Sequence, residues 1–207
     1  MVLTSLATWV LSGLLVLGVS FGGDLRLHGD SPSRVGHTSF GGDINVAHAS
    51  SGAHLRAFGG NVRLGETDGL VWVSSYGGRI EIESLAGSAR LTSRGGGVEV
   101  TVADKAQEKS RSIRIRSYGG EVALQLPEDF DATIEIRSRR PVDRPEQCEV
   151  RSDFALQESS RRVRTLSTLL RSFEERTATA TLGNGRHRIS IETDGGDVEL
   201  RRESSGR

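Results

Sequence analysis

Ala57–Leu64 (AFGGNVRL) returns one repeat later as Ser75–Ile82 (SYGGRIEI), and this pair of segments shows the repeat from which the fold can be predicted. The same pattern recurs as SFGGDLRL at 20–27, SFGGDINV at 39–46, SRGGGVEV at 93–100, SYGGEVAL at 117–124 and TDGGDVEL at 193–200. In the regular part, the leading glycines are Gly22, Gly41, Gly59, Gly77 and Gly95. Self-similarity at a nearly fixed period, here roughly 18 residues, is the sequence signature of a stacked repeat architecture.

Each repeat contains two short strands joined by a glycine corner. With the first glycine of each pair numbered zero, offsets +3 and +5 are apolar in every copy, as at Val62 and Leu64. Offsets −6 and −4 are apolar in most copies, as at Val71 and Val73, and offset −2 is always small. Such alternation is typical of half-buried strands, and the glycine pair suits a tight corner. Because one coil cannot bury its own apolar face, the coils must stack, and we expect an all-β, mostly parallel β-solenoid.

The repeat is interrupted after Gly119. LQLPEDFDATIEIR (124–137) predicts a strand, a turn at Pro127–Asp129 and a second strand, and DFALQ (153–157) predicts a short strand. Residues 159–176 are predicted to form an amphipathic helix, because apolar residues fall at helical spacing: Val163, Leu166, Leu169, Leu170 and Phe173. We interpret this helix as an insertion or cap rather than a second domain, since the repeat resumes at Ile189.

Residues 1–20 differ in composition from the rest of the chain. No charge occurs from Val2 to Phe21, which predicts a signal peptide or N-terminal membrane anchor over residues 1–20. Gly18 and Ser20 are small enough to precede a cleavage site. Alternatively, residues 13–20 form an apolar first strand, or the chain begins inside a longer protein. The remaining predicted units are a solenoid domain over 21–200 and a polar tail over 201–207, and the expected location is extracytoplasmic or associated with the cell envelope.

The charge balance limits the classes of partner. Lys plus Arg and Asp plus Glu number 27 each, which removes the overall attraction to nucleic acid or anionic membranes that a basic chain would have. We therefore expect no nucleic-acid partner. Cys148 is the only cysteine, so neither an intrachain disulfide nor a cysteine-based zinc site is possible.

The GGDI and GGDV elements, each followed by alternating apolar residues, resemble the bacterial adhesin-like β-strand repeat family, a domain of unknown function. The ending GNGRHRISIETDGGDVELRR (183–202) is similar to that family's closing repeat, and LPEDFDATIEI (126–136) to its Leu-Pro strand turn. The resemblance covers about residues 21–200. It implies a right-handed, mostly parallel β-solenoid in a bacterial envelope-associated protein, with no catalytic residues to transfer. The predicted helix departs from the family pattern.

No pattern in the chain identifies a catalytic, cofactor or metal site. The calcium-binding nonapeptide repeat needs Gly and Asp where offsets +3 and +5 are apolar here. Asp24, Asp43 and Asp197 share offset +2, but other copies carry Asn, Arg, Gly or Glu, which is typical of solvated surface. The histidines lack metal-ligand spacing, although His37 takes an inward offset. Carboxylates are dispersed singly, whereas polysaccharide-cleaving solenoids gather them in a cleft. We therefore expect no enzyme and no cofactor.

One surface feature suggests binding. Offset −1 carries an aromatic residue in most copies, and stacking of the coils is expected to align Phe40, Phe58, Tyr76 and Tyr118 into an aromatic strip. Such a strip suits sugar rings or a protein partner; alternatively, the rings stack on one another and shield the corner glycines. The leading hypothesis is a noncatalytic envelope protein whose solenoid surface binds a glycan or protein. The alternatives are a self-assembling scaffold and, more remotely, a polysaccharide-active enzyme.

Overall fold

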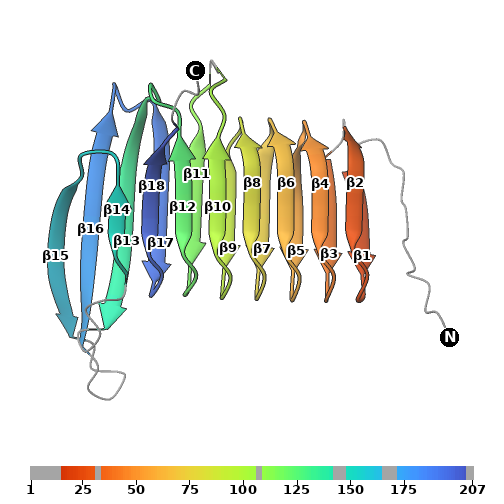
Figure 1. The fold of residues 1–207 in the computed structure, drawn as a ribbon, viewed down its shortest axis with the longest axis horizontal. Coiled ribbons are helices and arrows are strands. Elements are labelled where there is room, and N and C mark those ends of the chain that lie inside the picture. Colours follow the sequence, from red (N-terminus) through yellow and green to blue (C-terminus); the bar gives the residue numbers. More distant parts are fainter. Residues whose placement is uncertain (1–14, 31–33, 106–108, 142–147, 165–171, 204–207) are drawn as a thin grey trace.

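The computed structural model describes residues 15–30, 34–105, 109–141, 148–164 and 172–203. This part of the chain is all-β and forms two sheets of successive, mostly parallel strands (Figure 1). Successive strands from β1 to β12 alternate between the two sheets, so every repeat contributes one strand to each. This arrangement is the one expected of a β-solenoid.

The ten-stranded sheet is called sheet A and the eight-stranded sheet is called sheet B. Sheet A contains, in spatial order, β1 (Leu15–Ser20), β3 (Arg34–Ser39), β5 (Gly52–Ala57), β7 (Leu70–Ser75), β9 (Ala89–Ser93), β11 (Ser112–Ser117), β17 (His187–Asp194), β13 (Ala132–Pro141), β16 (Ser172–Leu182) and β15 (Gln157–Arg164). Sheet B contains β2 (Leu25–Asp30), β4 (Ile44–Ala49), β6 (Val62–Thr67), β8 (Ile80–Leu85), β10 (Val98–Val102), β12 (Val122–Leu126), β18 (Val198–Arg202) and β14 (Val150–Ser152).

The register of the sheets follows the repeat. Val62 pairs with Ile44 on one side and Ile80 on the other, each one repeat away, and Val73 pairs with Leu55 and Leu91 in the same way. The inward offsets predicted from the sequence form the core between the sheets: Val62, Leu64, Val71 and Val73 are all 0% exposed. The predicted strand pairs and their inward faces are therefore confirmed.

The second glycine of each corner is required by the neighbouring coil. A Cβ on Gly60 would lie 2.2 Å from the carbonyl oxygen of Gly42, and one on Gly78 would lie 2.1 Å from that of Gly60. By contrast, a Cβ on Gly59 or Gly77 would meet nothing closer than 3.7 Å. The first glycine of these two pairs is thus spatially tolerant, while the second marks the closest approach of stacked backbones.

The small residue at offset −2 also has a chemical role in the corner. The hydroxyl of Ser75 donates to the carbonyl oxygen of Gly78 at 2.7 Å, and Ser39, Ser93, Ser117 and Thr193 repeat this bond in their own corners. These side chains are at most 2% exposed. The hydroxyl thereby provides a hydrogen-bond donor to a corner carbonyl that is not paired in the strand ladder. Ala57 is the one alanine at this offset, and it brings no hydroxyl to the Gly60 corner.

The helix predicted over 159–176 is wrong. Ser159–Arg164 belong to β15 and Ser172–Arg176 to β16, while residues 165–171 lie outside the described residues. β16 pairs antiparallel with both β13 and β15. The alternation of threonine and small apolar residues at 177–182 favours a strand, and Ala178 and Ala180 are buried. Pairing on both sides satisfies the backbone of β16, which outweighs the helical spacing of a few apolar residues.

The other predictions for the interruption have mixed outcomes. β12 and β13 flank a turn in which the backbone N–H of Phe130 donates to the carbonyl oxygen of Pro127 at 3.2 Å, as expected. The short strand predicted over 153–157 is not formed as predicted: Asp153 and Phe154 lie in a bend, and β15 starts only at Gln157. Phe154 is 7% exposed and joins the hydrophobic core there.

The last repeat does not occupy the end of the stack. β17 lies between β11 and β13, and β18 lies between β12 and β14 (Figure 1). Both new neighbours of β17 are parallel to it, with Ile189 paired to Ile113 and to Ile134. In sequence order, β13 and β14 of the far coil therefore come before β17 and β18, which lie between that coil and the coil of β11 and β12.

Part of the N-terminal apolar stretch is a strand. β1 pairs in parallel with β3 along its whole length, from Leu15 opposite Arg34 to Ser20 opposite Ser39. Residues 1–14 lie outside the described residues. A signal peptide or anchor over 1–20 stays a prediction. Among the residues with described positions, no helix is long and apolar enough to cross a membrane.

Candidate binding surface

The aromatic strip forms a continuous stack along sheet A. The ring centroids of Phe40 and Phe58 are 4.8 Å apart with an interplanar angle of 1°, and those of Phe58 and Tyr76 are 4.8 Å apart at 12°. Phe21 extends the stack, with its ring 4.9 Å from that of Phe40. The spacing matches the separation of neighbouring strands, so the backbone ladder itself places the rings in contact.

An arginine fills the gap between the two tyrosines of the strip. The guanidinium carbon of Arg94 lies 4.7 Å from the ring centroid of Tyr76 and 6.0 Å from that of Tyr118. Both distances are within the range of cation–π attraction. Arg94 therefore continues the stack, and Asp194 follows at the same offset of the next coil.

The strip exposes ring edges rather than ring faces. Because each interior ring contacts the ring or guanidinium on either side, both of its faces are covered. Phe40, Phe58 and Tyr76 nevertheless remain 48%, 37% and 39% exposed. The predicted alternative in which the rings stack on one another is thus present in the structure. Binding by the strip stays a prediction, and a partner would meet the outer edges of the rings.

The corner holds the strip rigidly. The backbone N–H of Phe58 donates to the carbonyl oxygen of Ser39 at 2.9 Å, and that of Tyr76 donates to Ala57 at 3.0 Å. The hydrogen-bond ladder thus extends one residue beyond each strand. Tyr76 lies two positions after Ser74 and four after Trp72, so its side chain points to the same outer face of sheet A.

A second stack on this face was missed by sequence reasoning. The rings of His54 and Trp72 are 4.7 Å apart at 13°, and the guanidinium carbon of Arg90 lies 5.8 Å from the Trp72 ring. These residues share offset −5, which continues to Arg114. The repeat alignment contains this signal, but His, Trp and Arg are not recognised as a series until the register places them side by side.

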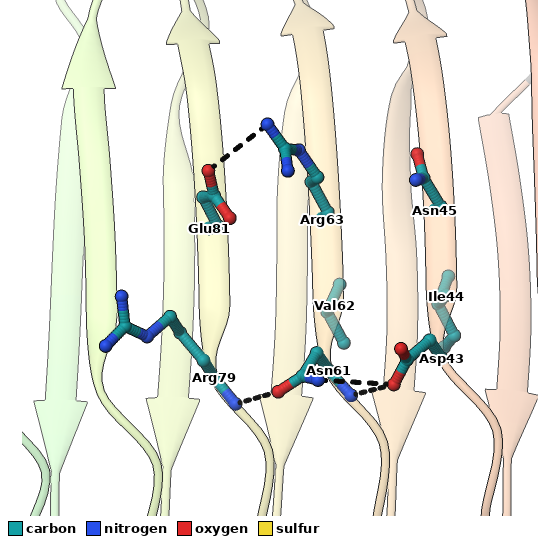
Figure 2. Close-up of a pocket in the computed structure, with 8 residues that line it drawn as sticks. All are labelled: Asp43, Ile44, Asn45, Asn61, Val62, Arg63, Arg79 and Glu81. Atoms are coloured by element: carbon teal, nitrogen blue, oxygen red, sulfur yellow. Dashed lines mark hydrogen bonds and ion pairs between the residues drawn. The ribbon is translucent and has the colours of Figure 1, made fainter.

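On the outer face of sheet B, the residues at offset +2 bind the neighbouring coil. A carboxylate oxygen of Asp43 accepts the backbone N–H of Asn61 at 2.7 Å, and the side-chain oxygen of Asn61 accepts that of Arg79 at 2.9 Å (Figure 2). Asp24 does the same for Asp43 at 3.0 Å. These aspartates were predicted to be solvated surface; they are exposed, but they also cap corner amides. One side-chain oxygen of Asp24 and one of Asp43 are thereby engaged by the neighbouring coil.

An open depression of about 410 Å³ lies on the same face, between β4, β6 and β8. The outward side chains around it are polar or charged, whereas Ile44 and Val62 at the same positions of the sheet are buried in the core (Figure 2). Arg63 lies 3.5 Å from a carboxylate oxygen of Glu81. The polar groups thus largely satisfy one another, and the depression does not gather unpaired carboxylates as a hydrolytic site would.

Two histidines are buried. Nε2 of His37 lies 3.1 Å from the hydroxyl of Ser20, and the side chain is 8% exposed, as its inward offset predicted. Nδ1 of His187 accepts the backbone N–H of Arg111 at 2.9 Å, and its ring stacks on Phe130. Burial lowers the pKa of both histidines, and Arg111 and Arg186 lower that of His187 further. Both side chains are therefore held in their neutral form near neutral pH.

No group of three or more His, Cys, Asp and Glu residues positioned to hold a metal occurs in the described ranges. The carboxylates of sheet B are instead engaged by arginines: Arg79 contacts Glu99 at 3.4 Å, and Arg201 contacts Glu199 at 2.6 Å. Cys148 is buried, and its thiol donates to the carbonyl oxygen of Arg139. The described surface is thus ordered by stacked and paired side chains.

Comparisons of the chain with protein-family models, with curated proteins and with solved structures each returned no match. The resemblance to the adhesin-like repeat family stays a prediction that rests on the glycine corners and the closing repeat.

Proposed function

We propose that this protein is a noncatalytic component of the bacterial cell envelope, built as a right-handed β-solenoid whose outer surface binds a partner. The observation that carries the proposal is the aromatic strip, whose central rings are 37–48% exposed. Single exposed hydrophobic residues are ordinary, but a contiguous row of them marks an interaction surface. Here the rings recur at one offset on a rigid ladder, so their positions are fixed before a partner arrives and little ordering entropy is lost on binding.

The same geometry restricts the mode of binding. A glycan cannot stack on the interior rings, because their faces already contact each other at 4.8 Å. A partner must lie across the ring edges of Phe40, Phe58 and Tyr76, along the axis of the stack. This requirement favours an extended or flat partner over a small molecule held in a pocket.

The test is retention on a bacterial cell-envelope fraction, which contains both wall and membrane. The triple variant Phe40→Ala, Phe58→Ala, Tyr76→Ala should lose retention. A matched variant with Arg26→Ala, Glu121→Ala and Arg201→Ala on sheet B should keep it. Thermal unfolding of both variants checks that the fold persists. Equal retention of the two variants would refute the role of the strip.

A self-assembling scaffold is the second candidate, favoured by the open side of β1. Within the described residues, no strand pairs with the outer side of β1 or β2, and free edges promote association. The opposite end argues against simple end-to-end growth. There, sheet A extends two strands beyond β13, and residues 157–161 of the outermost strand β15, which include Arg161, are exposed. Sedimentation velocity decides: length-variable polymers support the scaffold, and a concentration-independent monomer excludes it.

A further inference from the structure

The two outer faces of the protein differ in charge, although the chain as a whole is neutral. Across β3, β5, β7, β9 and β11, including the corner residue after each, sheet A contains no Asp or Glu. Six arginines lie outward there: Arg34, Arg56, Arg90, Arg94, Arg114 and Arg116. The matching strands of sheet B and their corner residues at offset +2 hold only Arg63 and Arg79 against six carboxylates: Asp43, Glu66, Glu81, Glu83, Glu99 and Glu121. Although the chain has equal numbers of positive and negative side chains, over these strands the arginines predominate on sheet A and the carboxylates on sheet B.

The exposed apolar residues lie on the same arginine-rich outer face of sheet A, which is called the basic face below. All the large hydrophobic side chains found exposed in the described part of the chain belong to sheet A strands or to their corners. Val19, Leu70 and Trp72 are 46%, 50% and 45% exposed on the strands, and the aromatic strip with Phe21 follows at the corners. One face thus combines arginine, tryptophan, tyrosine, phenylalanine and leucine, while the other carries the carboxylates.

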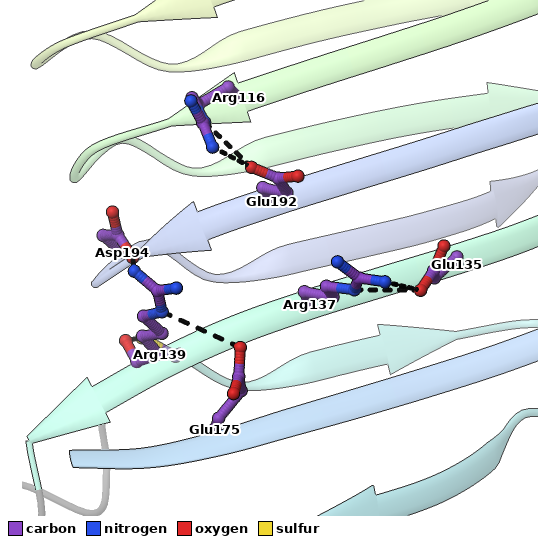
Figure 3. Close-up of polar contacts among 8 residues, drawn as sticks. Arg116, Glu135, Arg137, Arg139, Glu175, Glu192 and Asp194 are labelled. Carbon is purple, nitrogen blue, oxygen red and sulfur yellow. Dashed lines mark hydrogen bonds and ion pairs between the residues drawn. The ribbon is translucent and has the colours of Figure 1, made fainter. Parts of the chain in front are cut away.

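The basic face has a definite boundary at β17. From there onward, sheet A also carries carboxylates, and three of them pair with its arginines: Glu192 with Arg116 of β11, Glu135 with Arg137 and Glu175 with Arg139 (Figure 3). By contrast, Arg56, Arg90, Arg94 and Arg114 have no carboxylate partner among the described residues. Arg90 and Arg94 instead contact aromatic rings. No described carboxylate offsets these four charges, and they can therefore attract an external anionic partner.

We propose that the sheet A face from β3 to β11 docks on the surface of a lipid bilayer that contains anionic phospholipids. This inference rests on the proposed function and names the partner of the binding surface. Arginines near an anionic leaflet are attracted to its headgroups, and Trp and Tyr with neighbouring apolar side chains are suited to the headgroup boundary. The face of about 20 by 20 Å, from strand spacing and rise, lets all five strands meet a plane together.

The stacked rings favour a bilayer over other polyanions. Single-stranded nucleic acid binds by stacking its bases on free aromatic faces, and the interior faces of the strip are covered. A soluble acidic polymer would use the arginines but gains little from Leu70 and Trp72. Ring edges carry the positive end of the aromatic quadrupole, so edge-on insertion beside phosphate groups is favourable. The lipid surface is the partner that uses both the charge and the apolar side chains.

The test is co-sedimentation of the full-length chain with vesicles of phosphatidylcholine alone or mixed with phosphatidylglycerol. The wild type should partition more strongly onto the mixed vesicles than onto phosphatidylcholine alone, because any contribution of the residues before β1 is the same for both vesicle types. Arg90→Gln with Arg114→Gln should weaken this partition about 30-fold, which corresponds to about 1 kcal/mol per arginine at about 1.4 kcal/mol per tenfold. Arg26→Gln with Arg201→Gln makes the same charge change on sheet B and should have little effect. The residues before β1 are identical in all variants, so the comparison isolates the face.

A third variant separates a bilayer from a soluble polyanion. Leu70→Ser with Trp72→Ser should weaken partition onto mixed vesicles but leave binding to dextran sulfate unchanged. Equal partition onto both vesicle types, equal losses in the two arginine variants, or unchanged vesicle binding of the Leu70 and Trp72 variant would each overturn the lipid assignment. If the vesicle assay fails while the strip still governs retention on the envelope fraction, only this inference falls. If both fail, the proposed binding function falls as well.

Discussion

Replacing Gly78 with alanine should destabilise the protein far more than the same change at its neighbour Gly77. A Cβ on Gly78 would lie 2.1 Å from the carbonyl oxygen of Gly60, 2.4 Å from the carbonyl carbon and 2.8 Å from the backbone nitrogen of Asn61. All three atoms belong to the backbone of the preceding coil, so no side-chain rotation relieves the contact. Ordinary contact begins at 3.4 Å, and the coils must therefore move apart by more than about 1 Å.

The cost can be worked out from the bonds that cross this corner. The backbone N–H of Val62 donates to Arg79 at 2.8 Å, that of Tyr76 to Ala57 at 3.0 Å, and that of Arg79 to the side chain of Asn61 at 2.9 Å. A separation of about 1 Å breaks all three, at roughly 1 kcal/mol each. The reduced entropy of the unfolded chain offsets about 0.4–1 kcal/mol. We expect a net loss of about 2–3 kcal/mol.

Gly77→Ala is the matched control. A Cβ there would meet the carbonyl oxygen of Phe58 at 3.8 Å, an ordinary contact. Its expected effect lies between none and a gain of about 1 kcal/mol. Urea unfolding followed by far-ultraviolet circular dichroism measures the free energy of unfolding of both variants. Coincident midpoints for Gly77→Ala and Gly78→Ala would refute the argument that coil spacing requires the second glycine.

Ala57→Ser supplies the hydroxyl that the Gly60 corner lacks and should raise the free energy of unfolding by about 1 kcal/mol, while Ser75→Ala should lower it by about 1–2 kcal/mol; unchanged urea midpoints would contradict both. The pKa of His187 is lowered by burial from its ordinary value of 6.5, so below that pH the unfolded chain binds more protons and stability falls as the pH falls. His187→Asn keeps an acceptor for Arg111 without titrating, and its unfolding free energy should fall less over this range; a slope equal to that of the wild type would exclude the role of His187. A chain that ends at Gly185 lacks β17 and β18, so both β11 and β13 should lose protection from hydrogen exchange; full protection of β13 would contradict the interposed position of β17.

The repeat was readable from the sequence because its rules are local. Alternation at offsets −6, −4, +3 and +5 predicted strands whose inward residues are buried, and the corner glycines and outward aromatics lie where the alignment placed them. Every coil has the same immediate neighbours, so one alignment predicts the environment of each offset. The inward His37 and the turn at Pro127–Asp129 follow the same local rules.

Prediction failed where the neighbours change. Residues 159–176 lie beyond the regular coils, and the apolar spacing that indicated a helix did not reveal that β13 offers a long edge to β16. The interposed position of β17 was equally hidden, because the sequence order of strands does not fix their spatial order. The aromatic strip was located correctly, but its covered ring faces depend on the 4.8 Å spacing that only the assembled ladder provides.

By itself, the sequence determined the all-β repeat, its period, the corner chemistry and the outward position of the aromatic residues, because these depend on alternation and on contacts between identical neighbours. Tertiary structure decided the order of the last strands, the replacement of the helix by β15 and β16, and the separation of charge between the two outer faces. A net charge of zero does not reveal how the positive and negative side chains are distributed between the two outer faces. Only the division of successive strands between sheets A and B places, from β3 to β12, the unpaired arginines on one outer face and the carboxylates of these strands on the other.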